Sequence, residues 1–251
     1  MWNSPFNRPN TILSGLSRPR VTGFWKSRLP ALQASIFRTL RSLMAHVAPD
    51  SSNAADRRAE RRQAIISTAA QLFARDGYAN CEMESVAIQN GVAKGTLYLY
   101  FKSKEELFCT CVDSGMKQLQ TTVQAAGRLH DDPFVKISEA IRAYLMFFEQ
   151  HPEQAELLIQ ERAFFHNRQQ PTYFTYRDES RERWRSVWSG LLEDGSVRPE
   201  LKVDQILDFV GNLVYGTMFT NHFLGRSAEE QHAVIMDIFY RGIWSDSQRT
   251  S

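Results

Sequence analysis

Lysine and tyrosine side chains are concentrated in one short stretch, GVAKGTLYLYFKSKEEL, at residues 91–107. Lysines attract phosphates, tyrosine hydroxyls donate hydrogen bonds, and a glycine lets the backbone approach a partner closely. These residue types suit the recognition of a polyanion better than covalent catalysis. The residues that could make such contacts are Lys94, Gly95, Thr96, Tyr98, Tyr100, Lys102 and Lys104.

The sequence around this stretch predicts four consecutive helices. Apolar periodicity and end signals place them at about residues 57–77, 83–89, 94–101 and from 104 onward. Gly77 ends the first helix, Asn90-Gly91 forms the tight turn before the third, and Ser103 with Glu106 has capping-box spacing at the fourth. The order helix, short helix, turn, short helix predicts a helix-turn-helix.

A protein that reads DNA needs cations for the phosphates and a slim helix that enters the major groove. Segment 94–101 supplies the helix, and Leu97 and Phe101, four residues apart, are expected to anchor its inner face. The rings would then be divided between core packing and phosphate contacts. For any single tyrosine or lysine of this stretch, the alternative is that it belongs to the solvent-exposed face of an ordinary helix and has no role in DNA binding.

Charge is distributed unevenly along the chain. Residues 57–104 contain eight Lys or Arg and four Asp or Glu, whereas residues 105–251 contain 15 and 22. Residues 1–43 contain seven Lys or Arg and no acidic residue. A basic module followed by an acidic one predicts a polyanionic partner for the first.

Residues 62–108, RQAIISTAAQLFARDGYANCEMESVAIQNGVAKGTLYLYFKSKEELF, resemble the N-terminal DNA-binding domain of the tetracycline-repressor (TetR) family of bacterial regulators. LFARDGY, the VA-x3-GV turn and KGTLYLYFKSKEEL occur together in order and spacing. The apolar periodicity and end signals along the chain predict about nine helices. The resemblance implies an all-α homodimer, with a helix-turn-helix domain for operator DNA and a C-terminal domain for dimerisation and a small effector. It also implies a cytoplasmic repressor that the effector releases from a near-palindromic operator.

The resemblance assigns DNA contacts to Lys94, Gly95, Thr96, Tyr98, Tyr100 and Lys104. Two positions depart from the family pattern, because Cys81-Glu82 replaces a threonine pair and Ala93 replaces a serine-like cap. A carboxylate at Glu82 would repel phosphates. We therefore expect the affinity to depend also on the arginines at the start of the first helix, which are Arg57, Arg58, Arg61 and Arg62.

The C-terminal region also reads as helical, and its last two helices are predicted at about 203–224 and 227–244. Both are apolar on more than one side, so each should be buried against its own domain and against a twofold partner. The residues expected at that dimer interface are Ile206, Val210, Leu213, Val214, Val234 and Ile238. Gly211 and Gly216 would allow close approach of the two copies.

Aromatic residues are frequent between residues 147 and 188. Packing in the core is the simpler interpretation of these residues, and lining of a ligand cavity is the more specific one. The candidates for a largely apolar pocket are Phe148, Phe165, His166, Tyr176 and Trp184, with Asn167, Arg177 and His222 as further polar groups. A stripe of apolar residues over 134–148 includes Tyr144.

No cofactor or metal site is predicted, because the sequence contains no P-loop, no G-x-S-x-G, no G-x-G-x-x-G and no ligand set with metal spacing. Cys81, Cys109 and Cys111 do not form a disulfide framework, which fits a reducing compartment. The alternatives to a regulator are a helical enzyme or carrier with a vestigial DNA-binding domain, and a regulator tethered to a membrane.

Residues 1–56 are interpreted as an N-terminal extension, either disordered or a start-site artefact. Within it, apolar residues between 29 and 43 follow a helical stripe near several arginines. That stripe also fits a membrane-surface segment or a targeting sequence. Residues 57–104 are then predicted as the DNA-binding domain and 105–251 as the effector and dimerisation domain.

Overall fold

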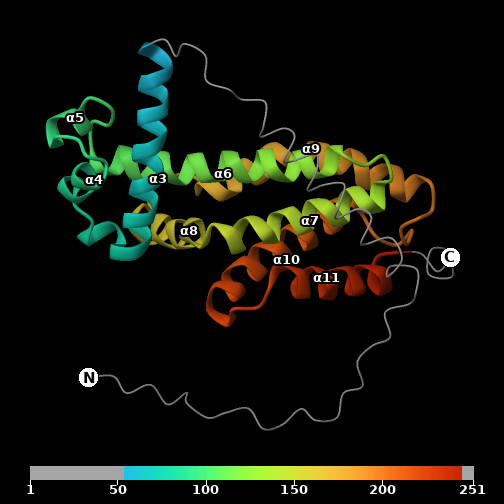
Figure 1. Ribbon diagram of the computed structural model, residues 1–251. Coiled ribbons are helices and arrows are strands. Elements are labelled where there is room, and N and C mark those ends of the chain that lie inside the picture. The colour runs from blue at the N-terminus through green and yellow to red at the C-terminus, as the bar shows by residue number, and fades with distance from the viewer. Residues whose placement is uncertain (1–53, 245–251) are drawn as a thin grey trace, which may run out of the picture. The chain divides into compact units, whose positions relative to one another are not determined.

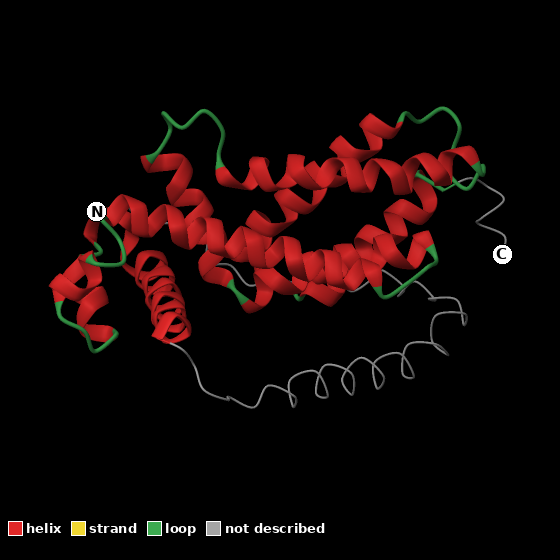
Figure 2. Cartoon of the chain, turned by 90° about the horizontal axis from the view of Figure 1, so that it is seen from above, coloured by secondary structure: helices red, strands yellow, loops and turns green. Residues whose placement is uncertain are grey.

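The computed structural model describes residues 54–244, apart from the side chains of residues 221–223. Most of the predicted N-terminal extension therefore lies outside the described residues, and so does the side chain of His222. The described part contains nine helices and no β-strand (Figures 1 and 2). This result confirms the predicted fold class.

The first three helices are α3 (Ala54–Asn80), α4 (Met83–Gln89) and α5 (Lys94–Tyr98). Gly77 interrupts α3 with φ 79° and ψ 153°, and Gly91 has φ 63° in the turn before α5. Both positions lie in a region of backbone space that glycine adopts without strain. α5 ends at Tyr98, three residues before the predicted end, because Leu99 and Tyr100 donate backbone bonds to the carbonyls three residues before them, Thr96 and Leu97, at 3.1 and 3.0 Å, which tightens the last turn.

The long helix α6 (Lys104–Arg128) begins at the predicted cap. Ser103 Oγ accepts from the Glu106 N–H at 3.0 Å. The reciprocal bond runs from the Lys102 N–H to Glu106 Oε2 at 2.7 Å, one residue before the N-cap. The carboxylate of Glu106 thus holds the chain between α5 and α6 as well as the helix start.

Five more helices complete the described part. They are α7 (Pro133–Gln150), α8 (Pro152–Phe164), α9 (Thr172–Glu193), α10 (Val203–Leu224) and α11 (Ala228–Gly242). Asp132 caps α7 through the Phe134 and Val135 N–H groups, and Ser227 and Glu230 form a complete capping box at α11. The predicted starts of α10 and α11 are confirmed to within one residue.

The C-terminal helices pack around α6 and α7, which lie side by side (Figure 1). α7 also contacts α10 and α11, while α9 contacts α6 and α10. α8 contacts α6, α7 and α10. Four helices, α6, α7, α9 and α10, therefore have faces directed toward a common interior.

The first turns of α6 belong to the core of the helix-turn-helix. Phe108 is fully buried and packs edge-on against Phe73 of α3, with ring centroids 5.1 Å apart. Its ring also contacts Tyr78 at 5.0 Å and Phe165, just after α8, at 5.3 Å. One ring thus joins the DNA-binding helices to the C-terminal helices.

We expect Phe108→Ala to lower the free energy of unfolding by about 3–5 kcal/mol, because the cavity would open between buried rings. Phe164→Ala is the matched control, since that side chain also contacts Tyr78 but is 47% exposed. The control should cost about 1 kcal/mol. Urea unfolding followed by circular dichroism measures both, and equal losses would contradict a central role for Phe108.

Candidate nucleic-acid interface and ligand cavity

α5 presents one side to the core and the other to solvent. Leu97 and Phe101 are fully buried, as predicted, in the same core cluster as Ile65 of α3 and Leu107 of α6. Tyr98 is 44% exposed, and Thr96 and Tyr100 are half-buried. Gly95 is exposed, and no described atom lies within 4 Å of the position that a Cβ would occupy. The outer side of α5 is therefore open to a partner.

Arginines of α3 lie next to the end of α5. The Arg58 guanidinium carbon is 5.7 Å from the centroid of the Tyr100 ring, and that of Arg62 is 4.9 Å from the Phe101 ring. Cation–π contact of this kind positions a guanidinium while leaving its N–H groups available. The structure thus brings two arginines from the start of α3 to the segment that was predicted to read DNA.

An acidic residue neutralises part of this positive surface. Lys94 Nζ is 3.1 Å from Glu84 Oε2, and this ion pair raises the pKa of Lys94. Glu82 is the N-cap residue of α4, but its side chain makes no capping hydrogen bond within the described residues. Both carboxylates are exposed beside α5, so the predicted repulsion of phosphates extends to Glu84.

Lys104 has an internal role that the sequence did not indicate. Its Nζ donates to the Ala79 carbonyl at 3.0 Å and lies 4.8 Å from the Tyr78 ring centroid. The ammonium group therefore ties the start of α6 to the chain after the Gly77 break. An ammonium has three donors, so a phosphate contact can coexist with this bond. Lys102 is exposed beside it.

Two exposed apolar residues of the helix-turn-helix were missed. Ile88 of α4 is 70% exposed and Leu99, directly after α5, is 74% exposed. Apolar side chains in a major groove can contact thymine methyl groups. The signal was present in the sequence, because Leu99 lies off the apolar face that includes Leu97 and Phe101, and Ile88 lies off the face of α4 that buries Met83, Val86 and Ala87.

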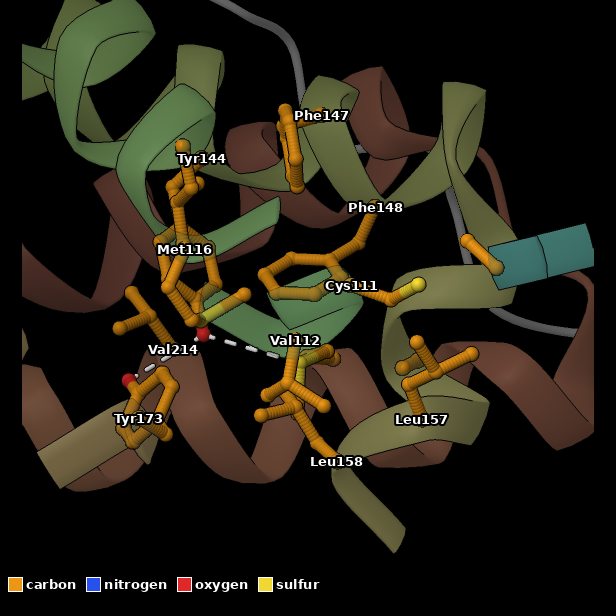
Figure 3. Close-up of a cluster of buried hydrophobic side chains, with 14 of the residues drawn as sticks. Cys111, Val112, Met116, Tyr144, Phe147, Phe148, Leu157, Leu158, Tyr173 and Val214 are labelled. Atoms are coloured by element: carbon orange, nitrogen blue, oxygen red, sulfur yellow. Dashed lines mark hydrogen bonds between the residues drawn. The ribbon is translucent and has the colours of Figure 1, made fainter. Parts of the chain in front are cut away.

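A cavity of about 170 Å³ lies between α6, α7, α9 and α10. Its wall is predominantly apolar and includes Met116, Tyr144 and Val214, which Figure 3 shows in the buried cluster. The Tyr144 hydroxyl donates to Tyr173 Oη at 3.2 Å (Figure 3). Burial raises the pKa of Tyr173 to about 12 and that of Tyr144 well above its ordinary value. Both hydroxyls are thus protonated at neutral pH.

Arginines supply the charge of the cavity wall. Arg177, Arg181 and Arg183 of α9 line it, and none of the described lining residues is Asp or Glu. Arg181 forms ion pairs with Asp204 and Asp208 at 2.8 and 2.7 Å, so its charge is neutralised within the protein. The Arg177 guanidinium lies 4.8 Å from the Phe174 ring centroid and pairs with its neighbour Asp178 at 2.9 Å, although Asp178 does not line the cavity.

A family model described as "Bacterial regulatory proteins, tetR family" matches residues 65–109. This range contains α4, α5, the turn between them, and the segments of α3 and α6 that bury Phe73 and Phe108. Residues 65–109 therefore form a domain of the tetR family of bacterial regulatory proteins.

Several bacterial transcriptional regulators resemble this chain over different lengths. The HTH-type transcriptional repressor KstR2 of Mycolicibacterium smegmatis is 26% identical over 153 residues, which are 61% of this chain and 75% of the relative. Two other bacterial regulators, 30% and 32% identical, are matched over only 40% and 46% of their own lengths. The second of these is described as a transcriptional activator.

Solved structures show the same fold. The ketosteroid transcriptional regulator KstR2 of Mycobacterium tuberculosis superposes with a TM-score of 0.58 at 22% identity, covering 80% of this chain and 100% of that chain. FadR of Bacillus subtilis, solved in complex with stearoyl-CoA, gives 0.59 at 18% identity, covering 72% and 98%.

The structure places the predicted pocket residues in three different environments. Tyr176 and Trp184 line the cavity, together with Arg177. Phe148 lines a second cavity next to Met218. Phe165 and His166 line neither of these cavities, because Phe165 stacks on Phe108 at the junction with the DNA-binding helices and His166 is exposed. Aromatic composition alone could not separate these surroundings.

The predicted dimer residues are also divided. Val234 and Ile238 of α11 are 60% and 46% exposed, as an interface requires, and Leu213 is half-buried. Ile206 and Val214 are buried inside the protomer, and Val210 and Val214 line the cavity. These three residues are corrected to interior positions, because one apolar side of α10 faces α9 and α7.

The two glycines of α10 differ in the same way. A Cβ at Gly211 would lie 3.7 Å from Arg177 Cδ, an ordinary van der Waals distance, so this glycine faces a cavity side chain rather than a second copy. No described atom lies within 4 Å of the corresponding position at Gly216, which remains at the surface. Phe209 of α10, 48% exposed, is an apolar surface residue that the prediction omitted.

The described residues contain neither a candidate membrane-spanning helix nor a candidate metal site. No helix between residues 54 and 244 has the length and hydropathy that crossing a membrane requires. Within the same range, no group of three or more His, Cys, Asp or Glu side chains is arranged to hold a metal ion.

We expect Glu84→Gln to strengthen binding to DNA at low salt, because Lys94 would lose its internal partner and become available to a phosphate. The slope of log K against log salt should become steeper by about 1. Glu182→Gln is the control, since it removes the same charge from an exposed position on α9. Fluorescence anisotropy with a labelled duplex measures the slopes, and identical slopes for Glu84→Gln and wild type would contradict this assignment.

Proposed function

We propose that this chain is a sequence-specific transcriptional regulator, a homodimeric repressor that a small ligand releases from a near-palindromic operator. The observation that carries the proposal is the open side of α5, with Thr96 and Tyr98 next to Arg58 and Arg62. An exposed short helix flanked by cations has the features that major-groove reading requires. The similarity to a repressor over 61% of this chain supports repression as the outcome.

The proposed DNA-binding, effector-binding and dimerisation functions are assigned to successive parts of the chain. Residues 57–104 bind DNA, residues 105–251 bind the effector and form the dimer, and residues 1–56 are an extension that neither activity requires. α6 crosses the boundary between the first two parts, since its first turns pack on α3. A change at the cavity therefore has a helix through which it can reach the helix-turn-helix.

Selection of bound duplexes from a random DNA pool tests the proposal. Residues 44–251 and the full chain should be used side by side at one stated salt concentration. Recovery of the same palindromic consensus by both would support specific dimeric binding and a dispensable extension. Failure of both to enrich any sequence would contradict the proposed function and would favour a helical carrier or enzyme.

Substitutions on α5 should separate sequence reading from phosphate contact. We expect Tyr98→Ala to weaken binding to all duplexes, whereas Thr96→Ala alters the base preference at one position of each half-site, with a change of about 1–3 kcal/mol. Repeating the selection with each variant measures the difference. An unchanged consensus for Thr96→Ala would remove Thr96 from the reading residues.

A second copy of the chain is proposed to cover the exposed apolar side chains of α10 and α11. Phe209, Val234 and Ile238 are about half exposed or more, an unusual state for large apolar residues on neighbouring helices. A C2 interface would bury the same surface on both copies. It would set the two α5 helices apart by about 34–36 Å or somewhat more, the spacing of successive major grooves.

We expect Ile238→Asp to convert the dimer to a monomer at micromolar concentration, because it would bury two unpaired carboxylates at the twofold interface. Leu129→Asp is the control, since Leu129 is 66% exposed between α6 and α7. Sedimentation velocity measures the mass. Loss of the dimer in the control alone, or in neither variant, would contradict the proposed interface.

The proposed effector is an amphipathic anion, with an apolar body in the cavity and a negative group at Arg177. The predominantly apolar wall, the protonated hydroxyls of Tyr144 and Tyr173, and the lack of acidic groups among the described lining residues support this chemistry. FadR of Bacillus subtilis, which has the same fold, was solved with stearoyl-CoA, a molecule of this class.

Dodecanoate and dodecanol, used below their aggregation limits, are matched probes for this effector class. We expect Arg177→Gln to weaken dodecanoate binding about tenfold or more while changing dodecanol binding little, because only the anion loses a charge-assisted hydrogen bond. Arg185→Gln is the control, since Arg185 is on the same helix and, like Arg177, pairs with an aspartate, but does not line the cavity. Calorimetry measures both ligands, and equal losses for the two would contradict an anion site at Arg177.

A further inference from the structure

We infer that two adjacent polar residues of α8, Gln160 and Glu161, couple the cavity to the DNA-binding helices. The inference rests on the proposed function and assigns the residues through which that regulation passes. α8 contributes no lining residue to this cavity, yet it makes buried polar contacts with the backbone at Tyr78, near the end of α3, and with Thr172 at the start of α9. Buried polar side chains are costly unless they are hydrogen-bonded, so their partners indicate what they hold in place.

Gln160 holds the break in α3. Gly77 leaves the helical conformation, which turns the Tyr78 N–H out of the regular hydrogen-bond ladder. Gln160 Oε1 accepts from this N–H at 2.7 Å, and Gln160 Nε2 donates to the Phe73 carbonyl at 2.9 Å. One amide therefore bridges the two sides of the break. The angle at which α3 continues into the chain before α4 depends on this amide.

The Gln160 side chain has little freedom. It is 6% exposed, and the second hydrogen of Nε2 donates to Glu156 Oε1 at 3.0 Å. Aromatic contacts at the end of α8 support the same junction, since Phe165 packs edge-on against Tyr78 with centroids 4.9 Å apart. A shift of α8 along or around its axis must therefore displace the Tyr78 backbone or break the amide contacts.

Glu161 holds the start of α9. Its carboxylate is 1% exposed and accepts from the Thr172 N–H at 3.1 Å and from the Thr172 hydroxyl. Arg168 pairs with the same carboxylate. Thr172 is the first residue of α9, and the next residue, Tyr173, is in the cavity wall. Displacement of Tyr173 by a ligand would therefore be transmitted to Glu161.

The two contacts together form a continuous connection from Tyr173 through Thr172, Glu161 and Gln160 to Tyr78. Each step is a covalent neighbour or a buried hydrogen bond, so the connection has few ways to absorb a displacement. Gln160 and Glu161 act as positioning residues, since neither lines the cavity nor lies on the proposed DNA surface. Coupling between two sites is reciprocal, so DNA binding must also change the start of α9.

Hydrogen exchange measured with and without DNA tests the inference and needs no identified effector. The full chain is compared alone and with a saturating concentration of its selected duplex. In the wild type, the duplex should slow exchange of the amides in residues 171–177 by roughly fivefold or more, the lower end of typical coupling factors. Gln160→Met, which keeps the side-chain length but removes the amide, should abolish this slowing while the duplex remains bound.

A matched control is available on the same helix. Gln154 is also buried, at 8% exposure, but its amide oxygen has no hydrogen-bond partner among the described residues and lies next to Gly115 of α6. Gln154→Met should therefore retain the wild-type response. Loss of the response in Gln154→Met as well would overturn the assignment in favour of general loosening of α8.

Glu161→Gln provides a second variant should Gln160→Met fail to fold. It keeps the volume but can place an NH2 group against the Thr172 N–H, and it should also abolish the slowing at residues 171–177. A wild-type response in either folded variant would overturn the inference, as would a wild-type chain that binds its duplex without any change at these residues. Failure of the wild type to bind any duplex would instead contradict the proposed function itself.

Discussion

Burial of the first turns of α6 against α3 is the contact on which the rest of the structure depends. A three-helix unit of roughly 50 residues buries too little apolar surface to be stable by itself. Leu107, Phe108 and Cys111 of α6 are fully buried in the same core as Ile65 and Phe73. The helix-turn-helix is therefore completed by a helix that continues into the cavity wall. Recognition of DNA and occupancy of the cavity share one structural element for this reason.

The charges on the DNA-binding helices are more balanced than a count of basic residues indicates. Lys94 is paired with Glu84 and Lys104 is bound to a backbone carbonyl, while Arg58 and Arg62 lie over aromatic rings. Two of the lysines thus contribute to the local fold before any DNA arrives. Weak background attraction favours discrimination, because non-specific binding depends almost entirely on phosphate contacts. The arginines and the hydroxyl groups of α5 then carry a larger share of the specific contacts.

The helix starts, the fold class and the inner residues Leu97 and Phe101 could be predicted, because capping residues and apolar periodicity are local signals. The dimer residues of α10 could not be separated from its core residues, since the helix is apolar on two sides and periodicity does not indicate which side meets α9. Of the five predicted pocket residues, only Tyr176 and Trp184 line the cavity between α6, α7, α9 and α10. Phe165 is as aromatic as they are, but tertiary packing places it against Phe108.

The polar interior was the least predictable part. No pattern in the sequence distinguishes Gln160 and Glu161 from solvent-facing residues of a short helix. Their partners lie at the break near Gly77 and at the start of α9. Lys104 likewise matched a phosphate-binding pattern without any indication that it binds the Ala79 carbonyl. Such contacts join segments that are far apart in the chain, so no local pattern in the sequence could indicate them.

The central claim is that α5, held by α3 and α6, reads base sequence in a duplex. The most direct measurement is the ratio of the dissociation constants of the full chain for its selected duplex and for a scrambled duplex of equal length and composition, at one near-physiological salt concentration. We predict a ratio of at least about 10³ in favour of the selected duplex, the lower end for specific DNA-binding proteins. Equal dissociation constants would show that the chain binds phosphates without reading bases and would contradict the account.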